Sequence, residues 1–416
     1  MRCSFDKDYL LSTDNDKSNI HKKGYRSVKG GIYQILRYDK DVLSYDNYKQ
    51  VGLYRSVVVN LVSKKLVSFS PNKSLNLSDI TVNDMEHIRA EEFVEGTMIN
   101  LFYDSEQGCW DIATRSTVGG NVKFYRNSSK TFAALFEETC VIAGLEFEGN
   151  LSKEYMYSFV IQHPENRIVC PISQPALYLT SVYKQREESI DGKQQIHIDA
   201  FDFNTDSLLT TELKTVKDYI VNNTKVKLPM VYVEACHTVQ TYVDKYASAN
   251  TSYDVMGVVF KDVRNGFQRY KARNPNYEDV RRMRGNQSKL QYTYLELRKN
   301  GKMTTYLKVY AEDKQRFSQY RSQIHTFTHG LYKNYIMCYI KKQAPLVEWP
   351  QQFRIHMFNI HQKYLNEYVQ EKKHITFQDV VEYFNEMHPS QQMALLNYNF
   401  RTSKLGSNET EIAQER

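Results

Sequence analysis

The sequence has no long apolar run, no paired cysteines and only 2 tryptophans. None of its apolar stretches approaches the ~18 residues of a membrane helix, and its first residues lack the apolar core of a secretion signal. The six cysteines are scattered, with no CxxC pair and no metal-ligand spacing, which argues against a zinc knuckle and a disulfide framework. We therefore expect a cytoplasmic protein with reduced thiols and no membrane segment.

Charge is unevenly distributed along the 416 residues. The formal net charge is +7, but residues 261–350 hold 19 Lys or Arg against 7 Asp or Glu. A basic block in an otherwise near-neutral chain indicates a polyanionic partner such as nucleic acid. A solvated basic surface that serves solubility is the alternative.

Short runs of β-branched and aromatic residues predict a mainly β region, and helical spacing of apolar residues follows it. Strands are predicted at 57–59, 98–103, 122–125, 157–161, 176–183, 195–201, 253–260 and 292–297, and helices at 130–143, 209–222, 234–247 and 278–289. After Ala311 helical spacing dominates, and Thr376 is expected to cap a helix. The fold class is therefore α+β with antiparallel sheets, followed by an all-helical C-terminal domain.

These patterns define four parts of the chain. Residues 1–28 form a polar segment that is expected to be poorly ordered at its start. Residues 29–310 form the α+β domain and 311–400 the helical domain. The polar tail at 401–416 is expected to be disordered.

Four segments resemble, in the same order, motifs of the phage-type tRNA-repair RNA ligases. They are residues 54–59 with 65–74, 92–99 with 110–116, 157–169, and 253–259 with 270–273. The most distinctive is the Pro-x-Asn-Arg-Ile-Val run at 164–169. Ligase-like proteins of large DNA viruses share this style of sequence, which suggests a viral origin and a location in the host cytoplasm or a viral factory.

The resemblance implies an antiparallel-sheet nucleotidyltransferase domain of the ATP-grasp-like ligase type, with ATP and Mg²⁺ as cofactors of an active enzyme. Such a ligase needs a lysine amine to attack the α-phosphate of ATP, and carboxylates to hold the metal. The lysine position is Phe93 in this chain, and two carboxylate positions are Val160 and Met256. The resemblance therefore implies a degenerate catalytic site.

Other positions keep the family pattern. The scaffold glycines Gly96 and Gly257 remain. The residues expected to bind nucleotide or phosphate are Arg55, Lys73, Glu95, Arg115, Arg167, Lys271 and Arg273. Those expected to bind RNA are Arg281, Arg282, Arg284 and Lys289. No metal site is expected, although Asp254 lies on the same strand face as Met256 and is a weak candidate for the lost carboxylate.

The leading hypothesis is an RNA-binding protein on a ligase fold that has lost catalysis, with structured RNA such as tRNA or mRNA as its partner. One alternative is an active RNA ligase or capping-type nucleotidyltransferase in which Lys73 is a relocated nucleophile. Another is a structural or protein-interaction module in which Phe93, Val160 and Met256 are ordinary core residues. Protein partners cannot be inferred from the residues.

Overall fold

A computed structural model describes residues 3–399 except 14–18, 40, 42, 44–47, 124–129, 207–208, 265–267, 286 and 288. The chain divides into two compact units, Met1–Arg281 and Arg282–Arg416, here called the N-terminal and C-terminal units. No described helix is both long and apolar enough to cross a membrane.

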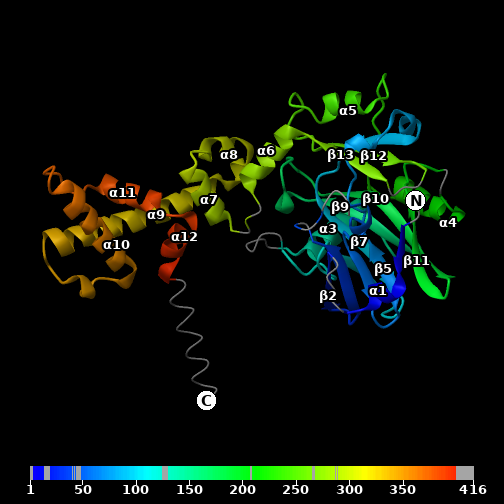
Figure 1. Ribbon diagram of the computed structural model, residues 1–416, viewed down its shortest axis with the longest axis horizontal. Coiled ribbons are helices and arrows are strands. Elements are labelled where there is room, and N and C mark those ends of the chain that lie inside the picture. The colour runs from blue at the N-terminus through cyan, green and yellow to red at the C-terminus, as the bar shows by residue number, and fades with distance from the viewer. Residues whose placement is uncertain are drawn as a thin grey trace, which may run out of the picture. The chain divides into compact units, whose positions relative to one another are not determined.

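The N-terminal unit contains three antiparallel sheets (Figure 1). The largest has the order β1 (Cys3–Asp6), β11 (Lys193–Phe201), β10 (Ala176–Ile190), β9 (Tyr155–Gln162), β7 (Thr97–Asp104), β8 (Cys109–Ala113). The second runs β2 (Ile20–Arg26), β3 (Ile32–Tyr38), β4 (Val57–Asn60), β5 (Lys65–Phe69). The third runs β13 (Arg269–Arg273), β12 (Gly257–Asp262), β6 (Ile88–Glu92).

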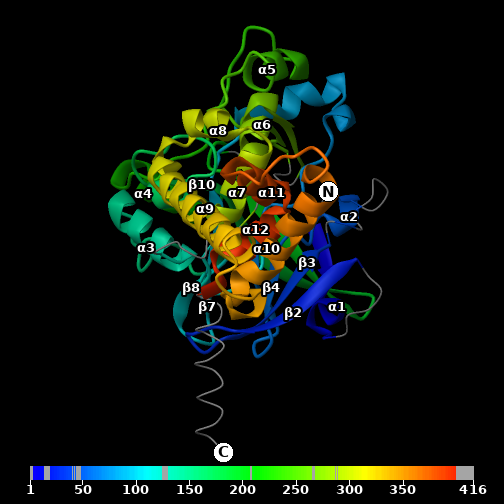
Figure 2. The same ribbon diagram turned by 90° about the vertical axis from the view of Figure 1, so that its left-hand side faces the viewer.

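The six-stranded sheet buries both of its faces. Helices α3 (Phe132–Ala143) and α4 (Thr211–Asn223) cover one face, and the four-stranded sheet packs against the other (Figure 2). Because strand residues alternate between faces, Tyr157 and Phe159 of β9 join the helix-side core, whereas Met156 joins the core shared with the four-stranded sheet. Val160 lies four residues after Met156 on β9, so its side chain points to the same face of the sheet as Met156, away from α3 and α4.

Short helices and turns complete the N-terminal unit. They are α1 (Lys7–Leu11), α2 (Tyr48–Val51), η1 (Leu77–Asp79), η2 (Val82–His87), η3 (Pro164–Asn166), α5 (Val239–Tyr246) and α6 (Pro275–Arg284), whose last residues extend past Arg281. Threonine side chains cap three of the helices: Thr131 before α3, Thr210 before α4 and Thr238 before α5. Such caps satisfy backbone N–H groups that lack a helical partner.

The regular elements that the structure describes in the C-terminal unit are all helices. Its elements are α7 (Leu290–Lys299), α8 (Met303–Val309), η4 (Ala311–Asp313), α9 (Lys314–Tyr335), η5 (Ile336–Ile340), η6 (Leu346–Glu348), α10 (Gln351–Lys363), η7 (Tyr364–Tyr368), α11 (Phe377–Glu386) and α12 (Pro389–Leu396). Phe327, Phe353 and Phe384 meet in its core, with ring centroids 5.3 and 5.5 Å from that of Phe327. Thr376 caps α11 in a reciprocal pair with Asp379, as expected from the sequence.

The α+β class with antiparallel sheets and a helical C-terminal region is confirmed. The strand predicted at 292–297 is wrong, because this segment is helix α7. Alternating Tyr and Leu residues mimicked a strand there, yet Thr293, Tyr294 and Leu297 all become buried on the helix. Helices α7 and α8 lie before residue 311 and belong to the helical unit.

Several expected element ends also need correction. The start of the chain was expected to be poorly ordered, but Cys3–Asp6 is a strand in which Phe5 is buried. Strand β12 begins at Gly257 rather than 253, and helix α5 begins at Val239 rather than 234. Val122 and Lys123 form no strand, and the rest of the strand predicted at 122–125 lies outside the described residues, as does the tail at 401–416.

Candidate functional site

A cavity of about 380 Å³ is lined by residues from all three sheets of the N-terminal unit. The sheets contribute Tyr38, Glu91, Glu92, Met98, Val160, Thr180, Ser181, Val259, Lys261, Arg269, Lys271 and Arg273. Loops and helix α6 contribute Arg55, Lys73, Ser74, Phe93, Val94, Gly96, Arg115, Ile168, Pro229, Met256, Tyr277 and Arg281. The lining therefore combines an apolar part with many cations.

The three apolar positions singled out in the sequence line this one cavity. Phe93 directly follows β6, Val160 lies on β9, and Met256 directly precedes β12. Val160 is buried in a small cluster with Val94 and Tyr178. The structure thus brings together three residues, of which the first and the last lie more than 160 positions apart in the chain.

Two glycines hold the flanking loops against neighbouring strands. Gly96 has φ +148°, and a Cβ atom there would collide with the carbonyl oxygen of Ile161 on β9. Gly257 has φ +137°, and a Cβ atom there would collide with the carbonyl oxygen of Ala272 on β13. Both sites need glycine because another residue would suffer backbone strain and a steric clash. These close approaches fix Phe93 and Met256 beside the cavity.

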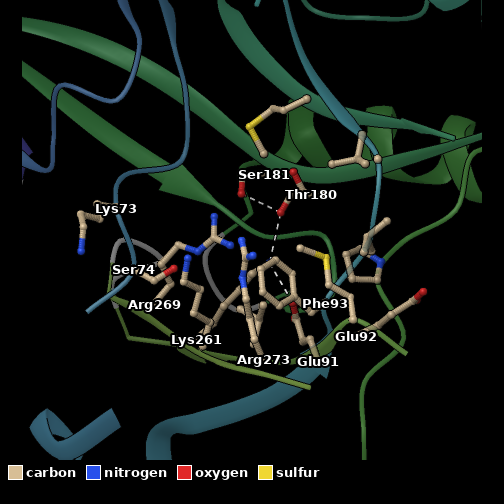
Figure 3. A pocket seen from close by; sticks show the side chains of 18 of the residues that line it. Lys73, Ser74, Glu91, Glu92, Phe93, Thr180, Ser181, Lys261, Arg269 and Arg273 are labelled. Atoms are coloured by element: carbon tan, nitrogen blue, oxygen red, sulfur yellow. Dashed lines mark hydrogen bonds and ion pairs between the residues drawn. The ribbon is translucent and has the colours of Figure 1, made fainter. Parts of the chain in front are cut away.

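One face of β13 carries a row of cations. Arg269, Lys271 and Arg273 alternate along the strand, so they share one face. The Lys271 Nζ atom lies 6.0 Å from the ring centroid of Phe93, and the guanidinium carbon of Arg273 lies 5.5 Å from it. Figure 3 shows Phe93 among Lys261, Arg269 and Arg273, with Thr180 and Ser181 across the cavity.

Much of this positive charge is not neutralised within the cavity. The Nε atoms of Arg115, Arg269 and Arg273 are buried and have no hydrogen-bond partner in the described part of the chain. Arg273 does pair with Glu278 of α6 through another nitrogen, and Arg115 lies over the ring of Tyr38. Buried donors without partners cost free energy unless a ligand supplies the acceptors.

Desolvation lowers the pKa values of three of these cations, and neighbouring cations add to the effect at Lys271 and Arg55. Lys271 reaches solvent through the open side of the cavity, yet the surrounding protein and then the charges of Arg273 and Arg269 lower its pKa to about 7. Burial and the charge of Arg269 lower the pKa of Arg55 to about 10. Burial also lowers the pKa of Arg269. An anion bound among these groups would relieve this repulsion.

The carboxylates of the cavity are already engaged. Glu91 is 1% exposed and accepts contacts from Arg89 at 2.5 Å and Lys261 at 2.8 Å. Burial raises the pKa of Glu92, whose carboxylate accepts a hydrogen bond of 3.3 Å from the backbone of Met230. Among the described residues, no group of three or more His, Cys, Asp or Glu is placed to hold a metal ion. The carboxylates of the cavity are thus held by protein cations and a backbone N–H group, and they are not free to bind Mg²⁺.

Two predicted binding residues lie away from the cavity lining. Glu95 is buried and accepts hydrogen bonds from the backbone N–H groups of Val169 and Cys170, at 3.1 and 3.0 Å. Arg167 donates to the carbonyl oxygen of Val169 at 3.0 Å. Both residues therefore organise the loop after β9 in this structure.

The remaining predicted residues divide between the two units. Arg55, Lys73, Arg115, Lys271, Arg273 and Arg281 line the cavity. The carbonyl oxygen of Asp254 contacts Cys170, and its side chain is not part of the lining. Arg282, Arg284 and Lys289 belong to the C-terminal unit, where the Arg284 guanidinium carbon lies 4.6 Å from the ring centroid of Tyr310.

The sequence analysis missed Arg269 and Lys261. Arg269 lies two residues before Lys271, so strand alternation was a signal that could have found it. Lys261 gave no such signal, because its partners come from distant parts of the chain.

Comparisons with known proteins give only loose likenesses. No family model matches the sequence, and no curated protein matches it significantly. Two forms of an archaeal ATP-dependent RNA ligase are 12% identical, with TM-scores of 0.35 and 0.37, covering 72% and 74% of this chain and 72% and 77% of theirs. A protein described as an ATP-dependent DNA ligase from Aquifex aeolicus is 12% identical, with a TM-score of 0.33, covering 88% of this chain and 74% of its own.

Proposed function

We propose that the N-terminal unit binds phosphate groups of an RNA end or a nucleotide in this cavity and does not transfer the nucleotide. The single observation that carries the proposal is the row of Arg269, Lys271 and Arg273 around Phe93, in which Arg273 alone has an ion-pair partner among the described residues. Guanidinium groups bind phosphate oxygens through paired hydrogen bonds, and lysine adds a point charge. The fold assignment to ligase-type nucleotidyltransferases is part of this proposal and rests on the motif order.

The chemistry of the lining supports binding without transfer. Nucleotidyl transfer on this kind of fold needs an amine aimed at phosphorus and a metal-holding carboxylate set. A phenyl ring stands at the position that the resemblance assigns to the lysine, and Glu91 is held by Arg89 and Lys261. The cations suit the phosphate chain of ATP, but the carboxylates do not suit its Mg²⁺.

RNA is the ligand class that best matches the remaining features. The cavity lining includes Arg281 in addition to the cations of β13, and RNA offers a terminal phosphate with further phosphates beyond it. Structured RNA such as tRNA or mRNA, a cytoplasmic setting and a viral origin belong to the same proposal. They rest on the motif resemblance alone.

The test compares RNA oligonucleotides that differ only in a 5′-phosphate or a 5′-hydroxyl. We expect the phosphorylated RNA to bind more tightly, and binding to weaken with added salt because ion contacts are screened. Lys271→Met should weaken binding, whereas Lys214→Met on the exposed face of α4 should not. Equal binding of both oligonucleotides by the wild type would contradict the proposal.

A second candidate function is nucleotidyl transfer by a relocated lysine. Lys73 and Lys271 both line the cavity, and a pKa of about 7 leaves part of the Lys271 population as the neutral amine. Attack of the amine on the α-phosphate of labelled ATP, with Mg²⁺ or Mn²⁺, would then release pyrophosphate and leave a lysyl-nucleotide phosphoramidate. This adduct should be stable to alkali and labile to acid, and Lys73→Met or Lys271→Met should abolish it. We expect no adduct, and finding one would replace the binding function with an enzymatic one.

A further inference from the structure

Lys261 lies at the centre of a buried ion network on the cavity wall. Its ammonium group is 2.8 Å from Glu91 Oε2 and 2.9 Å from Asp202 Oδ2, and it donates to the carbonyl oxygen of Thr180 at 3.1 Å. The Lys261 residue is only 9% exposed. Two of these oxygens, those of Asp202 and Thr180, accept hydrogen bonds from the ammonium group, and Glu91 Oε2 is its ion-pair partner.

The three oxygens come from three different elements. Glu91 lies on β6, Asp202 directly follows β11, and Thr180 lies on β10 at an irregularity in the pairing between β10 and β9. Bulges of this kind re-aim backbone and side-chain groups, often next to functional sites. The irregularity lies between Leu179 and Ser181, which brackets the residue whose carbonyl faces Lys261.

A second cation completes the network. Arg89 contacts Glu91 Oε1 at 2.5 Å and Asp202 Oδ2 at 2.6 Å. Asn204 donates from its side chain to Glu91 and from its backbone to Asp202. Two carboxylates thus face two cations, and removal of one cation would leave the group with a net charge of −1.

Two carboxylates and a carbonyl are the oxygen donors that Mg²⁺, Mn²⁺ and Ca²⁺ prefer. We propose that the Lys261 ammonium is a tethered cation that fills a divalent-ion site and makes phosphate binding in the cavity independent of added metal. The consequence for phosphate binding rests on the proposed function, whereas the assignment of the cation site does not.

The test removes the tethered cation and offers a metal. Lys261→Ala leaves the oxygens of Glu91, Asp202 and Thr180 with space between them. We expect this variant to bind one Mn²⁺, seen as loss of the free-ion signal in electron paramagnetic resonance, with a dissociation constant on the order of a millimolar. The wild type should bind none at the same concentration, because its ammonium fills the site and cancels its charge.

A double variant keeps the inference falsifiable. The double variant Lys261→Ala, Asp202→Asn replaces one of the two carboxylate ligands by a neutral amide. It should lose the Mn²⁺ binding that the single variant Lys261→Ala shows. Far-UV circular dichroism establishes that each variant is folded, and Lys261→Met provides a second folded form, in which an apolar chain fills the space and Mn²⁺ should not bind. Absence of Mn²⁺ binding in folded Lys261→Ala, or Mn²⁺ binding by the wild type, would overturn the inference.

A separate titration with inorganic pyrophosphate distinguishes this inference from the proposed function. In the presence of a chelator the wild type should bind pyrophosphate with unchanged affinity, and Lys261→Ala should bind it more tightly when Mn²⁺ is added. Failure of the wild type to bind pyrophosphate at all would contradict the proposed function, while the Mn²⁺ result would still decide the cation site.

Discussion

Two groups of cations, one at the wall of the cavity around Lys261 and one on β13, differ in how their charge is balanced. Lys261 and Arg89 face Glu91 and Asp202 in a network whose charges cancel. Among the described residues, the row on β13 has one ion pair, between Arg273 and Glu278. Desolvation, and then the charges of Arg273 and Arg269, lower the pKa of Lys271. The comparison teaches that positive charge at the cavity can serve either the fold or a ligand. The presence of a partner carboxylate separates the two cases.

Breaking the balanced network should have the largest effect. Glu91→Gln would remove the buried negative charge that pairs with Lys261 and Arg89. Loss of one member of a buried ion pair costs about 3–5 kcal/mol of the free energy of unfolding. The melting temperature should therefore fall by about 10 °C. Asp199→Asn removes the partner of Arg186, whose side chain is 44% exposed, and should cost less than about 1 kcal/mol. Equal losses in both variants would contradict a structural role for the network.

The network also predicts acid sensitivity. Burial alone would raise the pKa of Asp202, but Lys261 and Arg89 outweigh it and lower the pKa. A carboxyl group with a lowered folded pKa stabilises the fold above its unfolded pKa of about 4, and this contribution is lost as the pH falls through the folded value. Urea unfolding from pH 6 to pH 3 should show a steeper loss of stability in the wild type than in Asp202→Asn. Parallel curves would contradict this linkage.

Removing a cation from the β13 row should act on binding and spare the fold. Arg269→Met should weaken pyrophosphate binding about tenfold or more, because a hydrogen bond to a charged group contributes about 1.5–3 kcal/mol. Its melting temperature without ligand should stay the same or rise, since repulsion with Lys271 and Arg55 is relieved. Calorimetric titration gives the affinity for pyrophosphate, and a thermal melt of the same sample gives the melting temperature. A loss of stability with unchanged binding would place Arg269 with the structural cations.

Lys271 makes phosphate binding pH-dependent. Its folded pKa of about 7 lies below an unfolded value of about 10.4, so its charge opposes folding below pH 10 and does so fully below pH 7. A bound phosphate should raise this pKa, so binding near pH 8 should take up a proton. Titrations in buffers with different ionisation enthalpies measure that uptake, which Lys271→Met should abolish. The same variant should melt roughly 2 °C higher without ligand at pH 7.

The smallest effect is expected at Phe93. Its ring lies beside Lys271 and Arg273, and cation–π contacts at partly exposed sites contribute about 0.5–1 kcal/mol. Phe93→Leu should therefore weaken pyrophosphate binding two- to fivefold. A larger loss, comparable to that of Arg269→Met, would mean that the ring itself contacts the ligand.

Much of the site could be predicted because many of its residues belong to short sequence motifs. The motif order located Phe93, Val160 and Met256, and two glycines with positive φ fix the loops beside them. The pairing of Lys261 with Asp202 and Thr180 could not be predicted, because it depends on sheet register and on an irregularity in β10. Helix α7 was mistaken for a strand because tertiary packing overrode its alternating pattern.

The most direct test of the account is a calorimetric titration of the wild type with 5′-phosphorylated RNA in the presence of a chelator, repeated with Mg²⁺. The account predicts the same affinity in both conditions, because the cations of β13 bind the phosphate and Lys261 takes the place of a metal ion. Binding that appears only when Mg²⁺ is added would contradict it.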